Sequence, residues 1–314
     1  MKLIAHRGGA GLRVENTLAA FAHAIELGAD GAELDVHLSA DDQIIVHHDA
    51  RLNSGYCRHP QGDWISTGER MPLSALSAAQ LQAYDIGTPQ PGTDYARAFD
   101  RIEPQSGQRI PLLREVIELA KARSNRFFLL IEIKASLPSD AAQTLQAVAD
   151  AALAVIEQTG FVERSILCSF DWRTLRHIKT QWPAIPTWYI TPPLSWFGPG
   201  TPPASDIPPA AAHLDRVREQ YASGAAPWFA GFDPQRFAGS FPQAVAAAGG
   251  DAWYPFYRDC TARTCRESAQ LGLDRAAWSV NLRDQAALQR VVDAGVDNLT
   301  VDYPDWRPQM PAHG

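Results

Sequence analysis

The chain has 314 residues, of which 46% are hydrophobic and 20% charged, a composition that excludes a disordered or collagen-like protein. Its formal net charge of -7 and its lack of a basic run disfavour a nucleic-acid partner, which clustered Lys and Arg would have to bind. The sequence shows no signal peptide and no stretch near the roughly 20 apolar residues of a spanning helix, so we expect a cytoplasmic protein without a transmembrane segment.

Short apolar runs alternate with segments of helical periodicity along most of the chain. Strands are predicted at residues 2–6, 31–38, 127–134, 165–170, 187–190, 252–256, 277–280 and 298–301. Helices are predicted at residues 15–28, 112–123, 141–159, 172–182 and 284–294. A ninth strand candidate, residues 228–232, is set aside because it adjoins an irregular region. The alternation predicts an α/β fold, a single (β/α)8 TIM barrel spanning residues 1–314.

Two stretches depart from this alternation. Residues 50–110 mix glycine, proline and polar residues with one helical piece near 77–84, and we interpret them as a small insertion after the second strand, over the barrel mouth. Residues 191–212 are proline-rich and carry Trp196 and Phe197. A loop of that length in a compact protein is usually functional or mobile, so it is either a lid that touches substrate or a passive surface loop.

Carboxylates gather on the early strands. Glu33 and Asp35 lie two residues apart on one face of the second strand, and Glu132 lies near the end of the third. Three like charges at one barrel mouth require a positive partner, and carboxylate ligands suit a hard cation, Mg²⁺ or Ca²⁺, better than zinc. The alternative is a pair of surface carboxylates held in salt bridges.

Other ionisable side chains stand beside this cluster. His6 and His48 are the candidate general acid and base, because imidazole titrates near neutral pH. Arg7 and Lys134 are the candidate phosphate-binding residues, although each could simply pair with a carboxylate. His37 shares the face of Asp35 and could reach metal or substrate. The segment 15–17 could open the first helix or support the site.

Ten segments, in order and spacing, resemble the glycerophosphodiester phosphodiesterase family. They are His6-Arg7-Gly8, Glu15-Asn16-Thr17, Gly28-Ala29-Asp30, Glu33-Leu34-Asp35-Val36, His48-Asp49, Ile110-Pro111-Leu112-Leu113, Ile131-Glu132-Ile133-Lys134, Ser169-Phe170, Trp278-Ser279-Val280-Asn281 and Asp302-Tyr303-Pro304-Asp305. The resemblance implies a divalent metal on the three carboxylates, acid/base catalysis by the two histidines and phosphate binding by the two cations. It also places Trp278 near the glycerol end of the substrate, unless this side chain is barrel core.

The resemblance implies metal-dependent hydrolysis of a small glycerophosphodiester, such as glycerophosphocholine, to glycerol 3-phosphate and an alcohol. The glycerol 2-hydroxyl would attack phosphorus, and water would later open the cyclic phosphate. Three alternatives are lysophospholipase D-type cleavage of lysophospholipids, an inactive barrel that acts as a binding protein, and zinc-dependent amide hydrolysis, which the carboxylate ligands disfavour. Residues 50–57 lack the Arg-Thr-Thr often seen in the family, so the preferred alcohol is open, as is the oligomeric state.

Overall fold

The computed structural model describes residues 1–135, 137, 142–207, 209–279, 283 and 285–309. Eight parallel strands form its centre: β1 (Lys2–Ala5), β2 (Gly31–Leu38), β4 (Phe128–Ile133), β5 (Ser165–Ser169), β6 (Thr187–Ile190), β7 (Ala252–Tyr254), β8 (Asp274–Trp278) and β9 (Asn298–Val301). Because β1 pairs with both β2 and β9, the sheet closes into a ring. The predicted (β/α)8 barrel is therefore confirmed.

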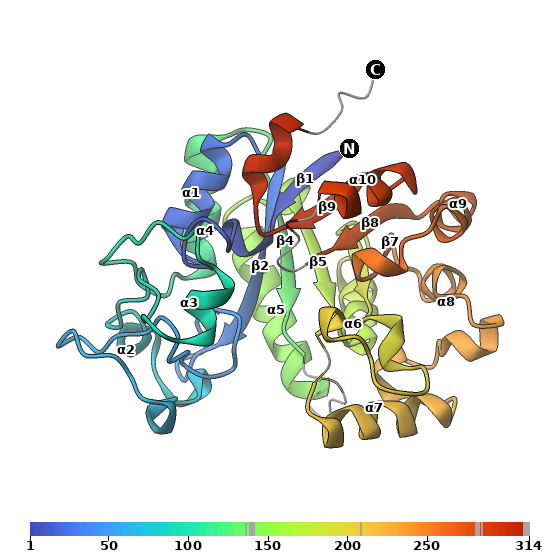
Figure 1. Cartoon of the computed structure of the whole chain (residues 1–314), viewed down its shortest axis with the longest axis horizontal. Helices are drawn as coiled ribbons and strands as arrows, with labels where there is room; N and C mark the ends of the chain where they lie inside the picture. The colour runs from blue at the N-terminus through green and yellow to red at the C-terminus, as the bar shows by residue number, and fades with distance from the viewer. Residues whose placement is uncertain (136, 138–141, 208, 280–282, 284, 310–314) are drawn as a thin grey trace.

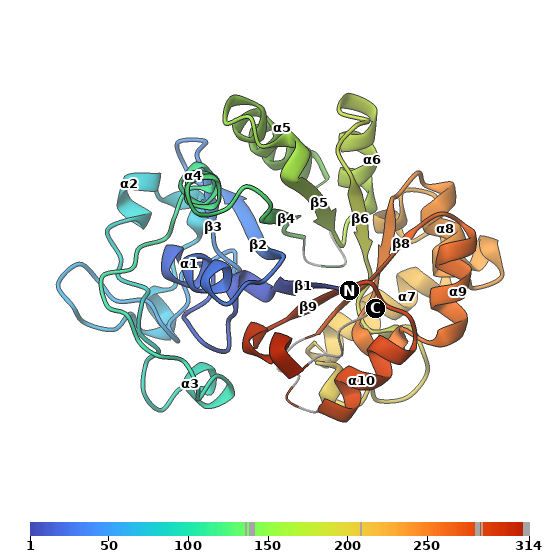
Figure 2. The ribbon, with the colours of Figure 1, turned by 90° about the horizontal axis from the view of Figure 1, so that it is seen from above.

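Helices surround the strands (Figures 1 and 2). They are α1 (Leu18–Glu26), α4 (Leu113–Arg123), α5 (Ala142–Gln158), α6 (Trp172–Gln181), α7 (Ala211–Ala222), α8 (Phe241–Ala247), α9 (Ala262–Gln270) and α10 (Gln285–Asp293). Within the described part of the chain, none is long and apolar enough to cross a bilayer.

The predicted elements correspond closely to the observed ones. The discarded strand candidate at 228–232 contains the end of a turn of 3-10 helix, Pro227–Phe229, so setting it aside was correct. Helices α7, α8 and α9 were not predicted. The α9 segment shows the reason, because within it only Cys265 and Ser268 are buried and most of its residues are polar, so no apolar stripe marks the helix in the sequence. Residues 141, 280, 281 and 284, which several predictions include, lie outside the described residues.

The two faces of β2 explain how the barrel positions its polar groups. Ala32, Leu34 and Val36 are fully buried in the apolar layer shared with α1, α4 and α5. Side chains alternate along a strand, so Glu33 and Asp35 point to the opposite face, inside the barrel. Deeper inside, an apolar cluster fills the barrel: Ile4, Leu130, Cys168, Trp188, Ile190, Ala252, Tyr254 and Ala276. The packed interior leaves the carboxyl ends of the strands for binding and chemistry.

The insertion begins with an unexpected reversal of the chain. Strand β3 (Ile44–Val46) runs antiparallel to β2 and pairs with its last residues. The rest of the insertion contains α2 (Ala78–Leu81) and α3 (Asp94–Ala98), which Figure 1 shows on the side of the strands away from α7. Its apolar side chains form a cluster of their own, which includes Ile45, Leu52, Tyr56, Leu81, Ile86 and Ile110. The insertion therefore has its own small core.

Candidate active site

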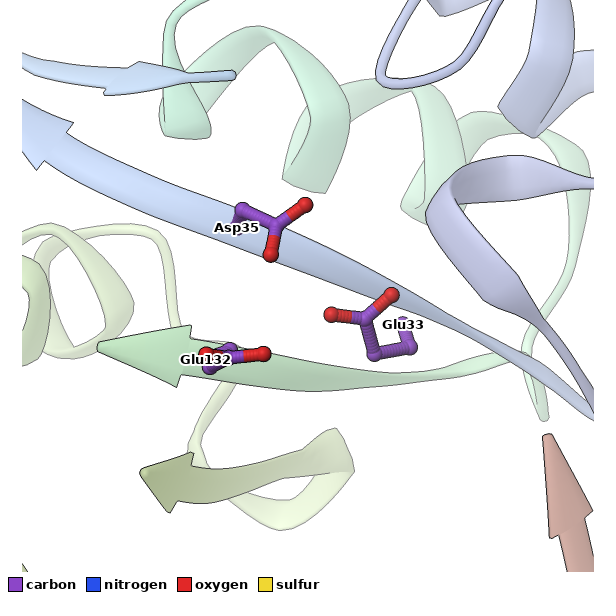
Figure 3. A group of neighbouring side chains, drawn as sticks. All are labelled: Glu33, Asp35 and Glu132. Atoms are coloured by element: carbon purple, nitrogen blue, oxygen red, sulfur yellow. The ribbon is translucent and has the colours of Figure 1, made fainter. Parts of the chain in front are cut away.

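Glu33, Asp35 and Glu132 meet inside the barrel near its carboxyl end (Figure 3). Parallel pairing of β2 with β4 sets Asp35 directly opposite Glu132, and Glu33 lies two residues earlier on the same face. One carboxylate oxygen from each lies within 4.8 Å of the others, and all three side chains are buried. The structure thus brings together the three carboxylates that the sequence grouped.

The charge of this cluster is not balanced by water, because its side chains are buried. Burial raises the pKa of Glu33 well above its usual range, and the neighbouring Asp35 and Glu132 carboxylates add to the effect. Burial likewise raises the pKa of Glu132. Among the described residues, nothing donates a hydrogen bond to the buried Glu33 Oε1. These residues fit a hard divalent cation, which would neutralise the carboxylates and take up the free oxygen.

Two cations lie against the cluster. Lys134 Nζ is 3.0 Å from Glu132 Oε1 and 3.3 Å from Asp35 Oδ1. Arg7 Nε is 3.4 Å from Asp35 Oδ2, while its Nη1 is 3.0 Å from Glu15 Oε1. Burial opposes ionisation of Asp35, but these cations hold the pKa of its carboxyl well below the usual range. Arg7 and Lys134 therefore pair with carboxylates, as the alternative interpretation held, and both also line a cavity.

Each candidate histidine is held by a carboxylate on its Nδ1. His6 Nδ1 lies 2.6 Å from Asp302 Oδ1, and His48 Nδ1 lies 2.9 Å from Asp49 Oδ1. This arrangement leaves Nε2 of each ring for proton transfer. Burial, with Arg7 and Lys134, lowers the pKa of His48 to about 3, and an anion bound between those cations would oppose their effect.

His48 is positioned by an antiparallel strand, whereas the other site residues follow or lie on parallel strands of the barrel. Strand β3 returns antiparallel from the mouth, and the His47 backbone N–H donates to the Asp35 carbonyl at 3.0 Å. The reversal sets His48 back beside the carboxylates. Half-buried His37 contacts the His48 carbonyl through Nε2 at 3.2 Å, and desolvation lowers its pKa to about 4.

Supporting residues come from both ends of the chain. Asn16 donates from Nδ2 to Asp35 Oδ2 at 2.8 Å, and its backbone adopts a left-handed conformation with φ 57°. The segment 15–17 thus both supports the site and precedes α1, whose first turn Thr17 caps. Asp302, fully buried just after β9, belongs to a segment that resembles the family, but the sequence assigned it no role in the site. A carboxylate directly after a barrel strand is the signal that could have indicated it.

A cavity of about 340 Å³ opens beside these groups. Its charged side is formed by His6, Arg7, Glu33, His48, Glu132 and Lys134, and its other side by Phe170, Ile190, Trp196, Asp206, Ile207, Tyr254 and Trp278. Trp278 Nε1 donates to the Thr191 carbonyl at 3.2 Å, which ties the tryptophan to the start of the loop 191–212. That loop supplies Trp196, Asp206 and Ile207, so it borders the cavity.

The segment 50–110 does not contribute to this cavity in the same way as the loop 191–212. Within the described ranges, none of the side chains that form the cavity wall belongs to this segment. That it covers the barrel mouth stays a prediction.

This geometry agrees with a comparison against known families. Residues 6–193 match the model of the glycerophosphoryl diester phosphodiesterase family. The chain belongs to this family. The prediction that it is a phosphoric diester hydrolase of this family is therefore confirmed.

Individual relatives extend the similarity over the whole chain. A glycerophosphodiester phosphodiesterase of Caldanaerobacter subterraneus subsp. tengcongensis is 26% identical over 304 residues, 96% of this chain and 94% of that protein. A solved structure from Silicibacter pomeroyi DSS-3, named as a candidate glycerophosphoryl diester phosphodiesterase, is 28% identical with a TM-score of 0.78. It covers 97% of this chain and 90% of that one. A lysophospholipase D of Mus musculus is 40% identical over 117 residues, 37% of this chain and 32% of that protein.

Proposed function

We propose that this member of the glycerophosphoryl diester phosphodiesterase family hydrolyses small glycerophosphodiesters, such as glycerophosphocholine, to glycerol 3-phosphate and an alcohol. One observation carries the proposal: three buried carboxylates, two carboxylate-held histidines and two cations gather at one end of the barrel. Hydrolysis of a phosphodiester requires a place for the anion, a proton acceptor and a proton donor, and this group of residues supplies all three.

Glu33, Asp35 and Glu132 would hold the divalent cation, Mg²⁺ or Ca²⁺. When bound, such an ion polarises phosphoryl oxygens and lowers the pKa of a coordinated hydroxyl group. The same cation would remove the mutual repulsion of the carboxylates and bring the pKa of Glu33 down. Lys134 and Arg7 each contact Asp35, and their positive charges would bind and orient the phosphate beside the cation.

The protein side chains account for the proton transfers. One of His6 and His48 takes the proton of the glycerol 2-hydroxyl, whose oxygen attacks phosphorus. The other gives a proton to the departing alcohol oxygen. Asp302 and Asp49 stabilise whichever imidazolium forms on their partner ring. Water then opens the cyclic phosphate with the two histidines in exchanged roles, which yields glycerol 3-phosphate.

Glycerol 3-phosphate release tests this proposal directly. Wild type should release it from glycerophosphocholine, whereas Glu33→Ala and His48→Ala should lose activity by at least about 10²-fold. Both substitutions lie at one edge of the cavity, so circular dichroism must show that each variant is folded. Normal activity in both variants would mean that the chemistry lies elsewhere. No activity of wild type on any diester would favour an inactive barrel that serves as a binding protein.

A second candidate is cleavage of lysophospholipids. The observation that favours it is the apolar side of the cavity, where Phe170, Trp196 and Ile207 could contact an acyl chain. Ile207 is also one of the few large apolar side chains exposed among the described residues, at 47%. Parallel assays of glycerophosphocholine and lysophosphatidylcholine separate the two. A cytoplasmic location and the absence of a nucleic-acid partner stay predictions.

A further inference from the structure

A second cavity, of about 460 Å³, lies beyond His48 and Lys134, the two residues that line both cavities. Its other walls come from the end of β2, the start of the insertion and the beginning of α5: Val36, His37, Leu38, Asp49, Ala50, Leu73, Ser74, Ala135, Thr144, Leu145 and Val148. Within the described residues, none of the three clustered carboxylates lines it. The second cavity therefore adjoins two of the proposed reacting groups and is separate from the proposed metal site.

The geometry of a phosphodiester suggests which part of the substrate occupies each cavity. The two ester groups of a phosphodiester extend from phosphorus in different directions. In displacement at phosphorus, the attacking oxygen and the departing oxygen lie roughly in line on opposite sides of the phosphorus atom. The glycerol 2-hydroxyl must approach the carboxylate cluster if a cation there is to act on it. Because Glu33 and Glu132 line the first cavity alone, the glycerol group belongs in the first cavity. The other alcohol group then points past His48 and Lys134.

We propose that the second cavity binds the alcohol that leaves the phosphodiester, with the phosphate held between the two cavities at His48 and Lys134. This inference rests on the proposed function. In the reaction, a bond forms between the glycerol 2-oxygen and phosphorus while the bond from phosphorus to the alcohol oxygen breaks. The electron pair of the broken bond stays on that oxygen, which takes the proton given by the acid histidine and departs through the second cavity.

The walls of the second cavity indicate which alcohols fit. Leu38, Leu73, Leu145 and Val148 give part of it a hydrocarbon surface, while His37, Ser74 and Thr144 add polar groups. Its carboxylate, Asp49, already contacts His48, Asn53 Nδ2 at 2.8 Å and Arg70 Nη2 at 3.2 Å.

A singly cationic or neutral alcohol with exposed methylene or methyl groups, such as choline or ethanolamine, suits these walls. An alcohol that carries a further phosphate would meet the Asp49 carboxylate and no unpaired cation among the described lining residues.

The test fills part of the second cavity with a larger side chain and measures which part of the substrate then affects kcat/KM. Thr144 is exposed near the start of α5, so Thr144→Trp places an indole in the cavity without disturbing the core. Thr180→Trp, at an exposed position of α6, is the matched control. The readout is the ratio of kcat/KM for glycerophosphocholine to kcat/KM for the methyl ester of glycerol 3-phosphate. We expect this ratio to fall about tenfold in Thr144→Trp and to stay at the wild-type value in Thr180→Trp.

Ile207→Trp provides the opposite case, because Ile207 lines the first cavity only. It should change the relative rates of substrates that differ on the glycerol, such as lysophosphatidylcholine and glycerophosphocholine. If Ile207→Trp instead lowers the choline-to-methyl ratio and Thr144→Trp leaves it unchanged, the alcohol binds in the first cavity and the inference is overturned. Ser74→Trp, at another exposed wall position, replaces Thr144→Trp if that variant does not fold. Absence of wild-type activity on both diesters would reject the proposed function itself.

Discussion

His6 and Asp302 join the first and last strands of the barrel through one contact, 2.6 Å between Nδ1 and Oδ1. The two residues are 296 positions apart in the chain, and Asp302 is fully buried. Closure of the ring between β1 and β9 is what brings them together. A carboxylate in this position orients the imidazole and stabilises its protonated form, as in other histidine–carboxylate pairs.

Asp302→Asn should therefore lower kcat by about 10²–10⁴-fold with little change in KM, because the amide cannot stabilise an imidazolium. The pH dependence of kcat should shift as well, since the variant removes the negative charge beside His6. Asp305→Asn is the control. Asp305 lies three residues after Asp302 and forms an ion pair with Arg101, away from His6. Equal kcat and an equal pH profile in Asp302→Asn and wild type would show that the pair is only structural.

Metal removal should destabilise the protein through the carboxylate cluster. A saturating cation that binds only the folded state adds about 3 kcal/mol to the free energy of unfolding at 100 times its dissociation constant. We expect Mg²⁺ or Ca²⁺ to raise the melting temperature of EDTA-treated wild type.

In Glu33→Gln the increase should disappear. The metal-free variant should melt at or above the temperature of metal-free wild type, because a neutral amide avoids the cost of burying an ionisable carboxyl group beside Asp35 and Glu132. Thermal melts with EDTA and with each cation measure both effects. Equal stabilisation of wild type and Glu33→Gln by the cation would place the bound ion elsewhere.

The stability of the protein should depend on pH through Asp259, which contacts the loop that borders the first cavity. Burial raises the pKa of Asp259 to about 6, and Asp206 adds to this shift, although Asp259 accepts a hydrogen bond from the Leu194 backbone N–H at 3.0 Å. The ordinary pKa of an aspartate is near 4 in the unfolded chain. Between these values the folded state binds more protons than the unfolded state, so the contribution of Asp259 to stability falls as the pH rises from about 4 to about 6.

Asp259→Asn should remove this contribution and keep the Leu194 hydrogen bond. Relative to wild type, the variant should become more stable by up to about 3 kcal/mol between pH 4 and pH 7. Urea unfolding of both proteins at several pH values in this range measures the difference. A difference that does not grow with pH would contradict the assignment to Asp259.

The fold was largely predictable because its signals are local. Most of the barrel strands appear as short apolar runs, although β8 begins at Asp274, three residues before the predicted strand 277–280. The alternation along β2 already separates Glu33 and Asp35 from Leu34 and Val36. The amphipathic helices α4 and α6 show clear periodicity for the same reason. The short or polar helices were missed. In α9 most residues are polar and only Cys265 and Ser268 are buried, so the sequence carries little apolar signal for this helix.

The candidate site was predictable residue by residue but not in its geometry. Residue types and strand positions indicated the three carboxylates and the two cations. The antiparallel return of β3, which carries His48 back beside Asp35, depends on tertiary pairing that the short run 44–46 does not reveal. The contact of Asp302 with His6 depends on ring closure, and the second cavity depends on how the insertion meets α5. Each of these joins segments distant in the chain.

The central claim is that the Glu33, Asp35 and Glu132 carboxylates hold a divalent cation that phosphodiester hydrolysis requires. The most direct test is the rate of glycerol 3-phosphate release from glycerophosphocholine by EDTA-treated protein, before and after Mg²⁺ or Ca²⁺ is restored. The account predicts a rate near background in EDTA and recovery when a cation is added. A rate in EDTA equal to that of untreated protein would contradict it.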